Sequence, residues 1–209
     1  MSRIVLFAQQ KGGAGKTMLL TQIAVAEAQA GRSVAIVDLD PQRSASEWHE
    51  ARVERLGGDG GVELFESVNW RASGDIRRAA KASDLTLIDS PGTAEVLRRV
   101  ALRSADFCVV PCQPSGADVW ACRQTLELLE KERMDHRVVL NRVPPRSNAA
   151  DAAAAELAVM GAPVIDPGIG ARSVFTEAFM KGLGVTELSK RSKASEEIRA
   201  VVATLRDVL

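Results

Sequence analysis

Short uninterrupted runs of apolar residues alternate along the chain with longer segments in which apolar residues recur every three or four positions. A short apolar run bounded by turn residues is typical of a buried strand, and the longer period is typical of a helix. The predicted strands are Arg3–Ala8, Val34–Val37, Val62–Phe65, Leu85–Asp89, Asp106–Pro111, Arg137–Leu140 and Pro163–Ile165. The predicted helices are Lys16–Ala30, Ser44–Arg55, Trp70–Ala82, Ala117–Arg133, Ala149–Met160 and Ala194–Val208.

This order of elements predicts an α/β fold, a mostly parallel twisted sheet flanked by helices. The chain has 209 residues, and we expect residues 1–209 to form a single domain with an ample core. Ser44 or Ser46 is the expected N-cap of the second helix. The glycine-rich run Gly57–Gly61 is expected to form a flexible loop within the domain.

Composition describes a soluble globular protein, with 46% hydrophobic and 26% charged residues. Lys+Arg and Asp+Glu both number 27, so overall charge argues neither for nor against nucleic acid, and any basic surface must be local. The cysteines Cys108, Cys112 and Cys122 form no C-x-x-C pair, and we expect reduced packing residues. Without a signal peptide or an apolar run of ~18 residues, the expected location is the cytoplasm.

The stretch Gln9–Thr17, Q-Q-K-G-G-A-G-K-T, lies between the first predicted strand and the first predicted helix. This context and spacing predict a phosphate-binding loop, since glycines let backbone N–H groups turn toward a phosphate. Lys16 can reach the terminal phosphates, and the Thr17 hydroxyl can ligate Mg²⁺. The predicted nucleotide-binding residues of this stretch are Lys11, Gly12, Gly13, Ala14, Gly15, Lys16, Thr17 and Met18.

Acidic residues end two other predicted strands, at the edge where open α/β sheets bind ligands. Asp38 and Asp40 lie in the segment D-L-D-P-Q, and Asp89 opens D-S-P-G. A carboxylate at this edge can hold hydrated Mg²⁺ or orient an attacking water. Thr17, Asp40 and Asp89 are therefore the candidate metal residues.

The loop form K-G-G-x-G-K-T, followed by D-L-D-P-Q and D-S-P-G, resembles the ParA/MinD family of deviant Walker-A ATPases. The resemblance covers nearly the whole chain. It implies ATP and Mg²⁺ as cofactors and an ATP-dependent homodimer in which Lys11 reaches the partner's nucleotide. It also implies that Asp40 orients or activates the hydrolytic water, which makes Lys11, Lys16 and Asp40 the candidate catalytic residues. Asn141 matches the position that reads adenine in many relatives.

Two departures from the family pattern matter. Met18 replaces a second threonine that is common after the loop. The residues before the first strand are too few for an N-terminal helix-turn-helix, so the chain is most similar to the small ParA-type partition ATPases.

The segment from Gly168 onward resembles the family's penultimate helix, which with the last helix carries DNA-gripping basic residues. The candidate DNA-binding residues are Arg172, Lys181, Lys190, Arg191 and Lys193. Ordinary surface charge is the alternative explanation for this set. A second basic cluster, Arg71, Arg77, Arg78 and Lys81, could form a basic patch, but a solvated helix face is the favoured interpretation.

The resemblance implies a slow, partner-stimulated ATPase that binds DNA non-specifically, associates with the nucleoid, and partitions or positions a plasmid, a chromosome or a protein cluster. A ParB-like or other adaptor protein is the expected stimulating partner. One alternative is a MinD-like membrane ATPase, but the final helix lacks Phe and Trp and contains Glu196, Glu197 and Asp207. The other alternative is a metabolic or metal-insertion relative built on the same core.

Overall fold

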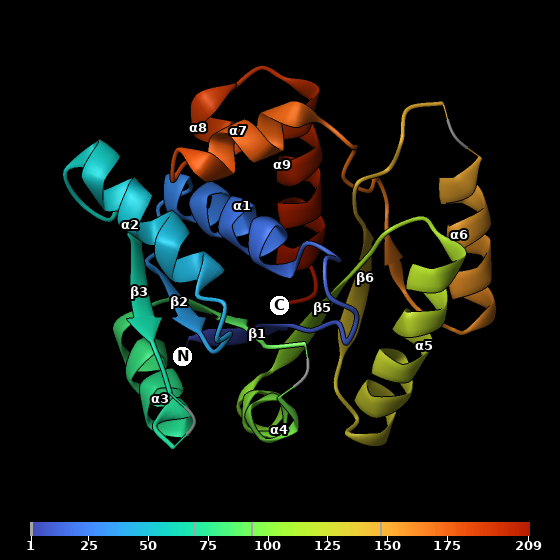
Figure 1. Ribbon diagram of the computed structural model, residues 1–209, viewed down its shortest axis with the longest axis horizontal. Coiled ribbons are helices and arrows are strands. Elements are labelled where there is room, and N and C mark those ends of the chain that lie inside the picture. The colour runs from blue at the N-terminus through green and yellow to red at the C-terminus, as the bar shows by residue number, and fades with distance from the viewer. Residues whose placement is uncertain (1, 69, 93, 147) are drawn as a thin grey trace.

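A twisted sheet of seven parallel strands forms the centre of the molecule (Figure 1). The computed structural model describes residues 2–68, 70–92, 94–146 and 148–209. The strands run in the order β3-β2-β4-β1-β5-β6-β7, and all their pairings are parallel. Their bounds are β1 Arg3–Phe7, β2 Val34–Asp38, β3 Val62–Glu66, β4 Leu85–Asp89, β5 Phe107–Cys112, β6 His136–Leu140 and β7 Val164–Ile165. The predicted fold class is confirmed.

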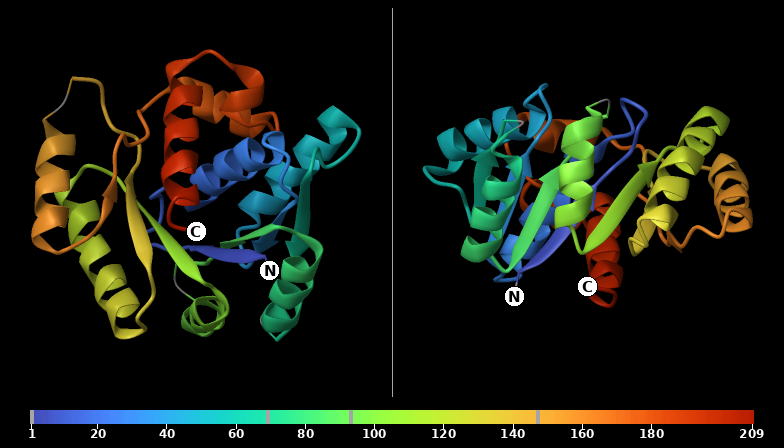
Figure 2. Two further views of the ribbon diagram at one scale, coloured as in Figure 1. Left: turned by 180° about the vertical axis from the view of Figure 1, so that it is seen from behind. Right: turned by 90° about the horizontal axis from the view of Figure 1, so that it is seen from below.

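Helices cover both faces of the sheet, as Figures 1 and 2 show. One layer contains α1 Lys16–Gln29, α2 Ser44–Leu56, α7 Ser173–Met180, α8 Val185–Leu188 and α9 Lys193–Arg206. The other contains α3 Ala72–Ala82, α4 Glu95–Ser104, α5 Gly116–Lys131 and α6 Ala149–Val159. No helix within the described ranges has both the length and the apolar character needed to cross a membrane.

The apolar runs of the sequence are continuous because helices cover both faces of the sheet. Along β1, Val5 and Phe7 face the core under α1, whereas Leu6 and Ala8 face the core under α4 and α5. Successive side chains of a strand point to opposite faces, so a doubly covered strand must be apolar at every position.

The predicted serine cap of α2 is wrong. The residue before this helix is Arg43, which has a left-handed conformation with φ 54° and makes no side-chain cap. Ser46 lies inside the first turn, and its hydroxyl donates to Asp38 Oδ2 at 2.8 Å. The serine therefore ties the helix to the end of β2 instead of satisfying the helix's own first N–H groups.

Helix α4 is absent from the sequence-based prediction, because its three arginines interrupt the apolar pattern. Leu97, Ala101 and Leu102 nevertheless form a buried stripe with helical spacing. Helix α3 begins at Ala72, two residues later than predicted.

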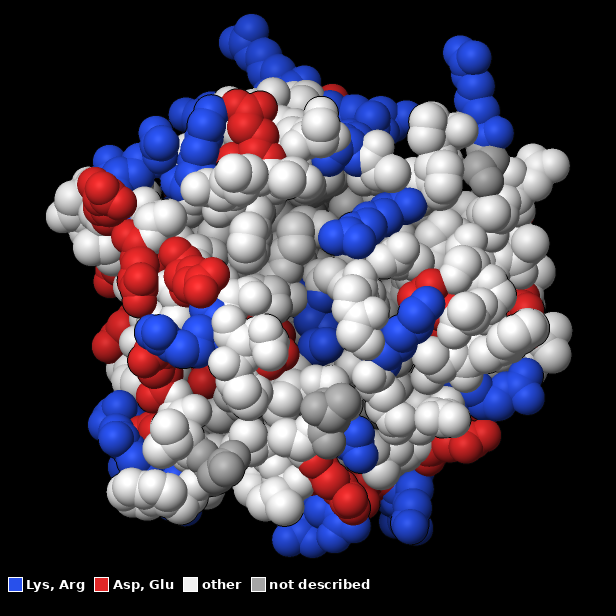
Figure 3. All heavy atoms as spheres, in the orientation of Figure 1, with Lys and Arg blue, Asp and Glu red and all other residues white. Residues whose placement is uncertain are grey.

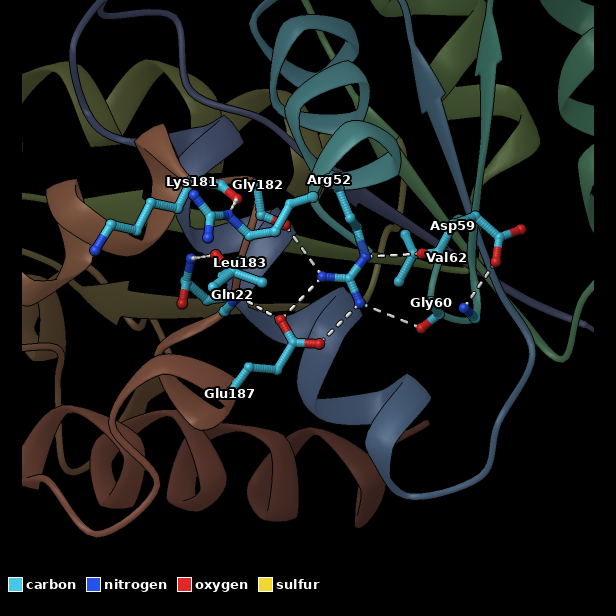
Figure 4. Close-up of polar contacts among 12 residues, drawn as sticks. Gln22, Arg52, Asp59, Gly60, Val62, Lys181, Gly182, Leu183 and Glu187 are labelled. Atoms are coloured by element: carbon cyan, nitrogen blue, oxygen red, sulfur yellow. Dashed lines mark hydrogen bonds and ion pairs between the residues drawn. The ribbon is translucent and has the colours of Figure 1, made fainter. Parts of the chain in front are cut away.

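A buried arginine joins α2 to the turn between α7 and α8 (Figure 4). Arg52 is 1% exposed, and its guanidinium donates to both carboxylate oxygens of Glu187 at 2.9 Å. It also donates to the carbonyls of Asp59, Gly60 and Gly182 at 2.7–3.2 Å. Gly182 has φ +65°, and a Cβ there would collide with the Arg52 backbone. Two carbonyls of the glycine-rich loop are thus held by one side chain.

Candidate nucleotide and magnesium site

The phosphate loop connects β1 to α1, and glycine is required at its last position. Gly13 and Gly15 have φ of 81° and 88°, conformations that L side chains rarely adopt. A Cβ on Gly15 would also collide with the Asn141 amide. That amide donates to the Ala14 carbonyl at 2.9 Å, so β6 supports the loop from behind.

Asn141 is fully buried and already engaged at both ends of its side chain. Its Oδ1 accepts the Arg142 backbone N–H at 2.9 Å, and its Nδ2 is bound to Ala14. Contact with an adenine edge would require this amide to exchange partners. In this conformation Asn141 positions the loop.

The two lysines of the loop occupy different environments. Lys16 is buried, and its Nζ donates to the Gln9 carbonyl at 3.4 Å, across the loop. The Lys11 side chain is 39% exposed and pairs with Asp118 Oδ2 at 2.8 Å. Asp118 lies in the first turn of α5 and also contacts the Ser115 hydroxyl. Lys11 is therefore folded back on its own chain.

Thr17 and Asp89 form an oxygen pair at the carboxyl edge of the sheet. The Thr17 hydroxyl donates to Asp89 Oδ2 at 2.6 Å, and the buried Asp89 Oδ1 has no hydrogen-bond partner among the residues that the structure describes. Burial raises the pKa of Asp89 to about 7, against the opposing hydrogen bond from Thr17. An unpartnered carboxylate oxygen beside a hydroxyl is the hard donor set that Mg²⁺ prefers, so these residues fit the ion.

Asp38 and Asp40, at the end of β2, have different environments and different roles. Asp38 accepts from the Ser46 backbone N–H and hydroxyl on one oxygen and from the Asp40 N–H on the other, all within 3.0 Å. Burial raises the pKa of Asp38 above its usual range. Asp40 is only half-buried and lines the cavity beside the loop. Asp38 thus fixes the segment that presents Asp40.

A cavity of about 640 Å³ opens over the loop, a volume within the range of small-ligand sites. The residues of the predicted site that line it are Gly12, Gly13, Gly15, Lys16, Thr17, Met18 and Asp40. The cavity is also lined by residues that the sequence did not predict, among them Arg142, Thr176 and Phe179. Arg142 is the second residue after the predicted strand Arg137–Leu140, and a position so close to a strand end signals the site edge. No local sequence signal marks Thr176 and Phe179 of α7.

The five candidate DNA-binding residues are not equivalent. Arg172 is bound to Glu197 at 2.7 Å, and Lys181 to Glu177 at 2.6 Å. Lys190, Arg191 and Lys193 are exposed around the start of α9 and have no ion pair within the part of the chain that the structure describes. In Figure 3, blue side chains lie along the upper left margin, over the region of α7 to α9 in Figure 1.

The parallel sheet, the glycine loop before α1 and the Thr17–Asp89 pair define a P-loop nucleoside triphosphatase fold. Residues 5–185 match the CobQ/CobB/MinD/ParA nucleotide binding domain. The chain therefore belongs to this ParA/MinD family, as its motifs predict.

Relatives and solved structures agree with this assignment. The chain is 30% identical over 202 residues to the maintenance of carboxysome distribution protein A of Halothiobacillus neapolitanus, covering 93% of this chain and 92% of that protein. The protein of the same name from Gloeobacter kilaueensis is 33% identical over 201 residues, covering 95% and 89%. The fold matches the cell division ATPase MinD of Pyrococcus furiosus with a TM-score of 0.82, at 20% identity and full coverage of both chains.

Proposed function

We propose that this chain is an ATP-dependent, dimerising ATPase that binds DNA non-specifically and positions a cargo. The observation that carries the proposal is the pair of loop lysines: Lys16 lies within the phosphate loop, whereas Lys11 is exposed and held by Asp118. A single phosphate site needs only the first of them. The exposure of the second supports a role in which a partner subunit's nucleotide competes with Asp118 for it.

The names of the relatives support a positioning role. Two relatives of similar length are carboxysome distribution proteins, and a further one, 28% identical over 192 residues, is a ParA protein. ATP and Mg²⁺ are the cofactors we assign, since an ATP complex of McdA from Cyanothece and an Mg-ADP complex of MinD from Pyrococcus horikoshii share the fold. Among cargoes, a protein assembly is favoured over a plasmid, because the carboxysome proteins are 30% and 33% identical to this chain, whereas the ParA relative is 28% identical with lower coverage.

The residues would act in the following roles. The loop N–H groups and Lys16 hold and orient the triphosphate, and Asp40 accepts a hydrogen bond from the attacking water. Thr17 and Asp89 would hold Mg²⁺, which when bound neutralises phosphate charge. Lys11 leaves Asp118 and neutralises phosphate charge in the other subunit, so turnover waits for the dimer. A slow basal rate and stimulation by an adaptor protein complete the proposal.

We assign DNA as the surface to which the dimer binds, and the residues that contact it are Lys190, Arg191 and Lys193. These exposed cations suit phosphate contacts without base recognition. A membrane role is disfavoured, because the apolar residues of α9, among them Ile198, Val201 and Leu205, are buried in the core. In a cell the ATP-bound dimer would therefore associate with the nucleoid.

The decisive experiment measures DNA binding by the Asp40→Ala variant with ATP and with ADP across a salt series. We expect ATP-dependent, sequence-indifferent binding that weakens steeply as salt rises. The same variant should keep ATP binding and dimerisation but lose turnover. Absence of DNA binding with both nucleotides would overturn the DNA role, and stimulation of wild-type hydrolysis by lipid vesicles instead of DNA would point to the membrane class.

A further inference from the structure

A basic surface on α3 and α4 plays no part in the roles assigned so far. Its exposed cations are Arg71, Arg77, Arg78, Lys81, Arg99 and Arg103. The two helices contain only two acids, Asp75 and Glu95, and α3 packs on α4. Part of this surface forms the lower margin of the molecule, where blue side chains lie in Figure 3.

One end of this surface is apolar and unusually exposed. Trp70 is 84% exposed, Val68 is 56% and Val96 is 71%. The Arg71 guanidinium lies 5.8 Å from the Trp70 ring centroid. Exposed tryptophan beside arginine is the composition of binding hot spots, whereas a merely solvated helix face needs neither.

A groove of about 390 Å³ lies between this apolar end and the segment that carries Asp40. Leu39, Pro41, Val68 and Leu97 form its apolar wall, and Asp40 and Arg71 also line it. The groove is large enough for a bulky side chain. An occupant would touch the D-L-D-P-Q segment directly.

We propose that this surface, the α3–α4 surface, binds a segment of a partner protein that is acidic and carries one large apolar anchor residue. The excess of cations on the two helices selects the acidic chain. The groove lined by Val68, Arg71 and Leu97 takes the anchor, and Trp70, whose ring lies beside the Arg71 guanidinium, borders the same end of the surface.

Two other occupants fit less well. Duplex DNA binds through its phosphates and offers no large apolar side chain to fill a groove with an apolar wall. An anionic membrane presents a broad flat surface, whereas the apolar wall here is concave.

An occupant of the groove could also affect ATP hydrolysis, because it would contact the segment that carries Asp40. This link rests on the proposed function, since it requires Asp40 to orient the water.

Peptide display tests the proposal without knowledge of the partner. A library of random peptides is selected on the nucleotide-free wild-type chain and counter-selected on the Trp70→Ala/Arg77→Glu double variant. Both changed residues are exposed, so unchanged thermal unfolding is expected to confirm folding. Arg123→Glu, the same charge change on an exposed residue of α5, is the matched control.

We expect the selected peptides to combine an excess of Asp and Glu with one aromatic or large aliphatic residue. Their affinity should fall about tenfold or more in each single variant, as expected if Trp70 contacts the bound peptide and Arg77 pairs with one of its acids. It should stay unchanged in Arg123→Glu. Replacing the anchor by serine or the acids by lysine should have the same effect.

Three results would overturn the proposal. The selection could yield no peptide that distinguishes wild type from the double variant, or it could yield peptides that are basic or lack an anchor. The third result is binding of duplex DNA or anionic vesicles that depends on Trp70 and Arg77. Because the selection uses no nucleotide, failure of the ATP-dependent DNA experiment would leave its result standing. A selected peptide that binds but leaves ATP turnover unchanged would overturn only the link to hydrolysis.

Discussion

At the scale of single residues, the phosphate loop depends on positions where an added side-chain atom would change the backbone conformation. Gly15 is the sharpest case, because its positive φ and its contact with Asn141 both exclude a side chain. Gly12 in the same loop has no atom near its missing Cβ and no positive φ, and so provides a matched control.

Gly15→Ala should destabilise the nucleotide-free chain by about 1–3 kcal/mol, the cost of a strained left-handed residue, and weaken nucleotide binding at least about tenfold. Gly12→Ala should leave stability nearly unchanged. Urea unfolding and titration with a fluorescent nucleotide measure the two effects. Equal stability of the two variants would show that the loop relaxes around Asn141.

The Lys11–Asp118 pair predicts that the apo chain restrains its own dimerisation. Asp118→Asn should free Lys11 and strengthen the ATP-dependent dimer severalfold, since a partly exposed pair contributes about 1 kcal/mol or less. Lys11→Ala should abolish the dimer while partly retaining nucleotide affinity. Light scattering with ATP measures both, and Glu177→Gln, which breaks an exposed pair on α7, is the control. A dimer that persists in Lys11→Ala would exclude the trans role.

At the scale of elements, long-range contacts decide which segments move together. Arg52 and Glu187 are 135 positions apart, yet their pair fastens α2, which follows the Asp40 segment, to α8 (Figure 4). Loss of the Glu187 carboxylate would leave the buried charge of Arg52 uncompensated. This lowers the free energy of unfolding far more than the loss of a surface ion pair.

Glu187→Gln should therefore lower the free energy of unfolding by about 2–4 kcal/mol. Glu177→Gln, the same change in an exposed pair of α7, should cost about 0.5 kcal/mol or less. Urea denaturation of the two variants gives the comparison. Similar costs would show that water reaches the Arg52 guanidinium once Glu187 is neutral.

The limits of sequence-based prediction also lie at the scale of elements. The strands and the loop motif were predictable, because apolar runs and glycine spacing are local signals. The role of Ser46 was not, since its partner Asp38 belongs to β2, and neither was the support that Asn141 gives to a loop 127 positions away. The groove of the α3–α4 surface was missed for the same reason: its walls come from three segments that are separate in sequence.

At the scale of the whole molecule, zero net charge hides a strongly uneven surface. Cations gather at the start of α9 and on α3 and α4, while Glu47, Glu50 and Glu54 are exposed on α2. Because positive and negative side chains lie on different surfaces, one chain can bind different partners at the same time. The overall composition does not reveal this uneven distribution of charge.

Replacing Lys190, Arg191 and Lys193 together by alanine in the Asp40→Ala background should reduce the slope of log affinity for DNA against log salt. Each lost phosphate contact lowers that slope by about 0.9, so a dimer that uses several of these residues should show a large change. Arg123→Ala on α5 is the control. An unchanged slope would place the DNA contacts elsewhere.

The grip of Arg52 on the glycine-rich loop has a practical consequence. The guanidinium holds carbonyl oxygens of Asp59 and Gly60, so the loop keeps its path whatever side chain its neighbour Gly58 carries. A Cβ on Gly58 would meet open space, and the native thiols Cys108, Cys112 and Cys122 are all buried. Gly58 lines neither the nucleotide cavity nor the groove of the α3–α4 surface. Gly58→Cys would therefore offer an attachment point for a fluorescent dye with which single molecules could be followed.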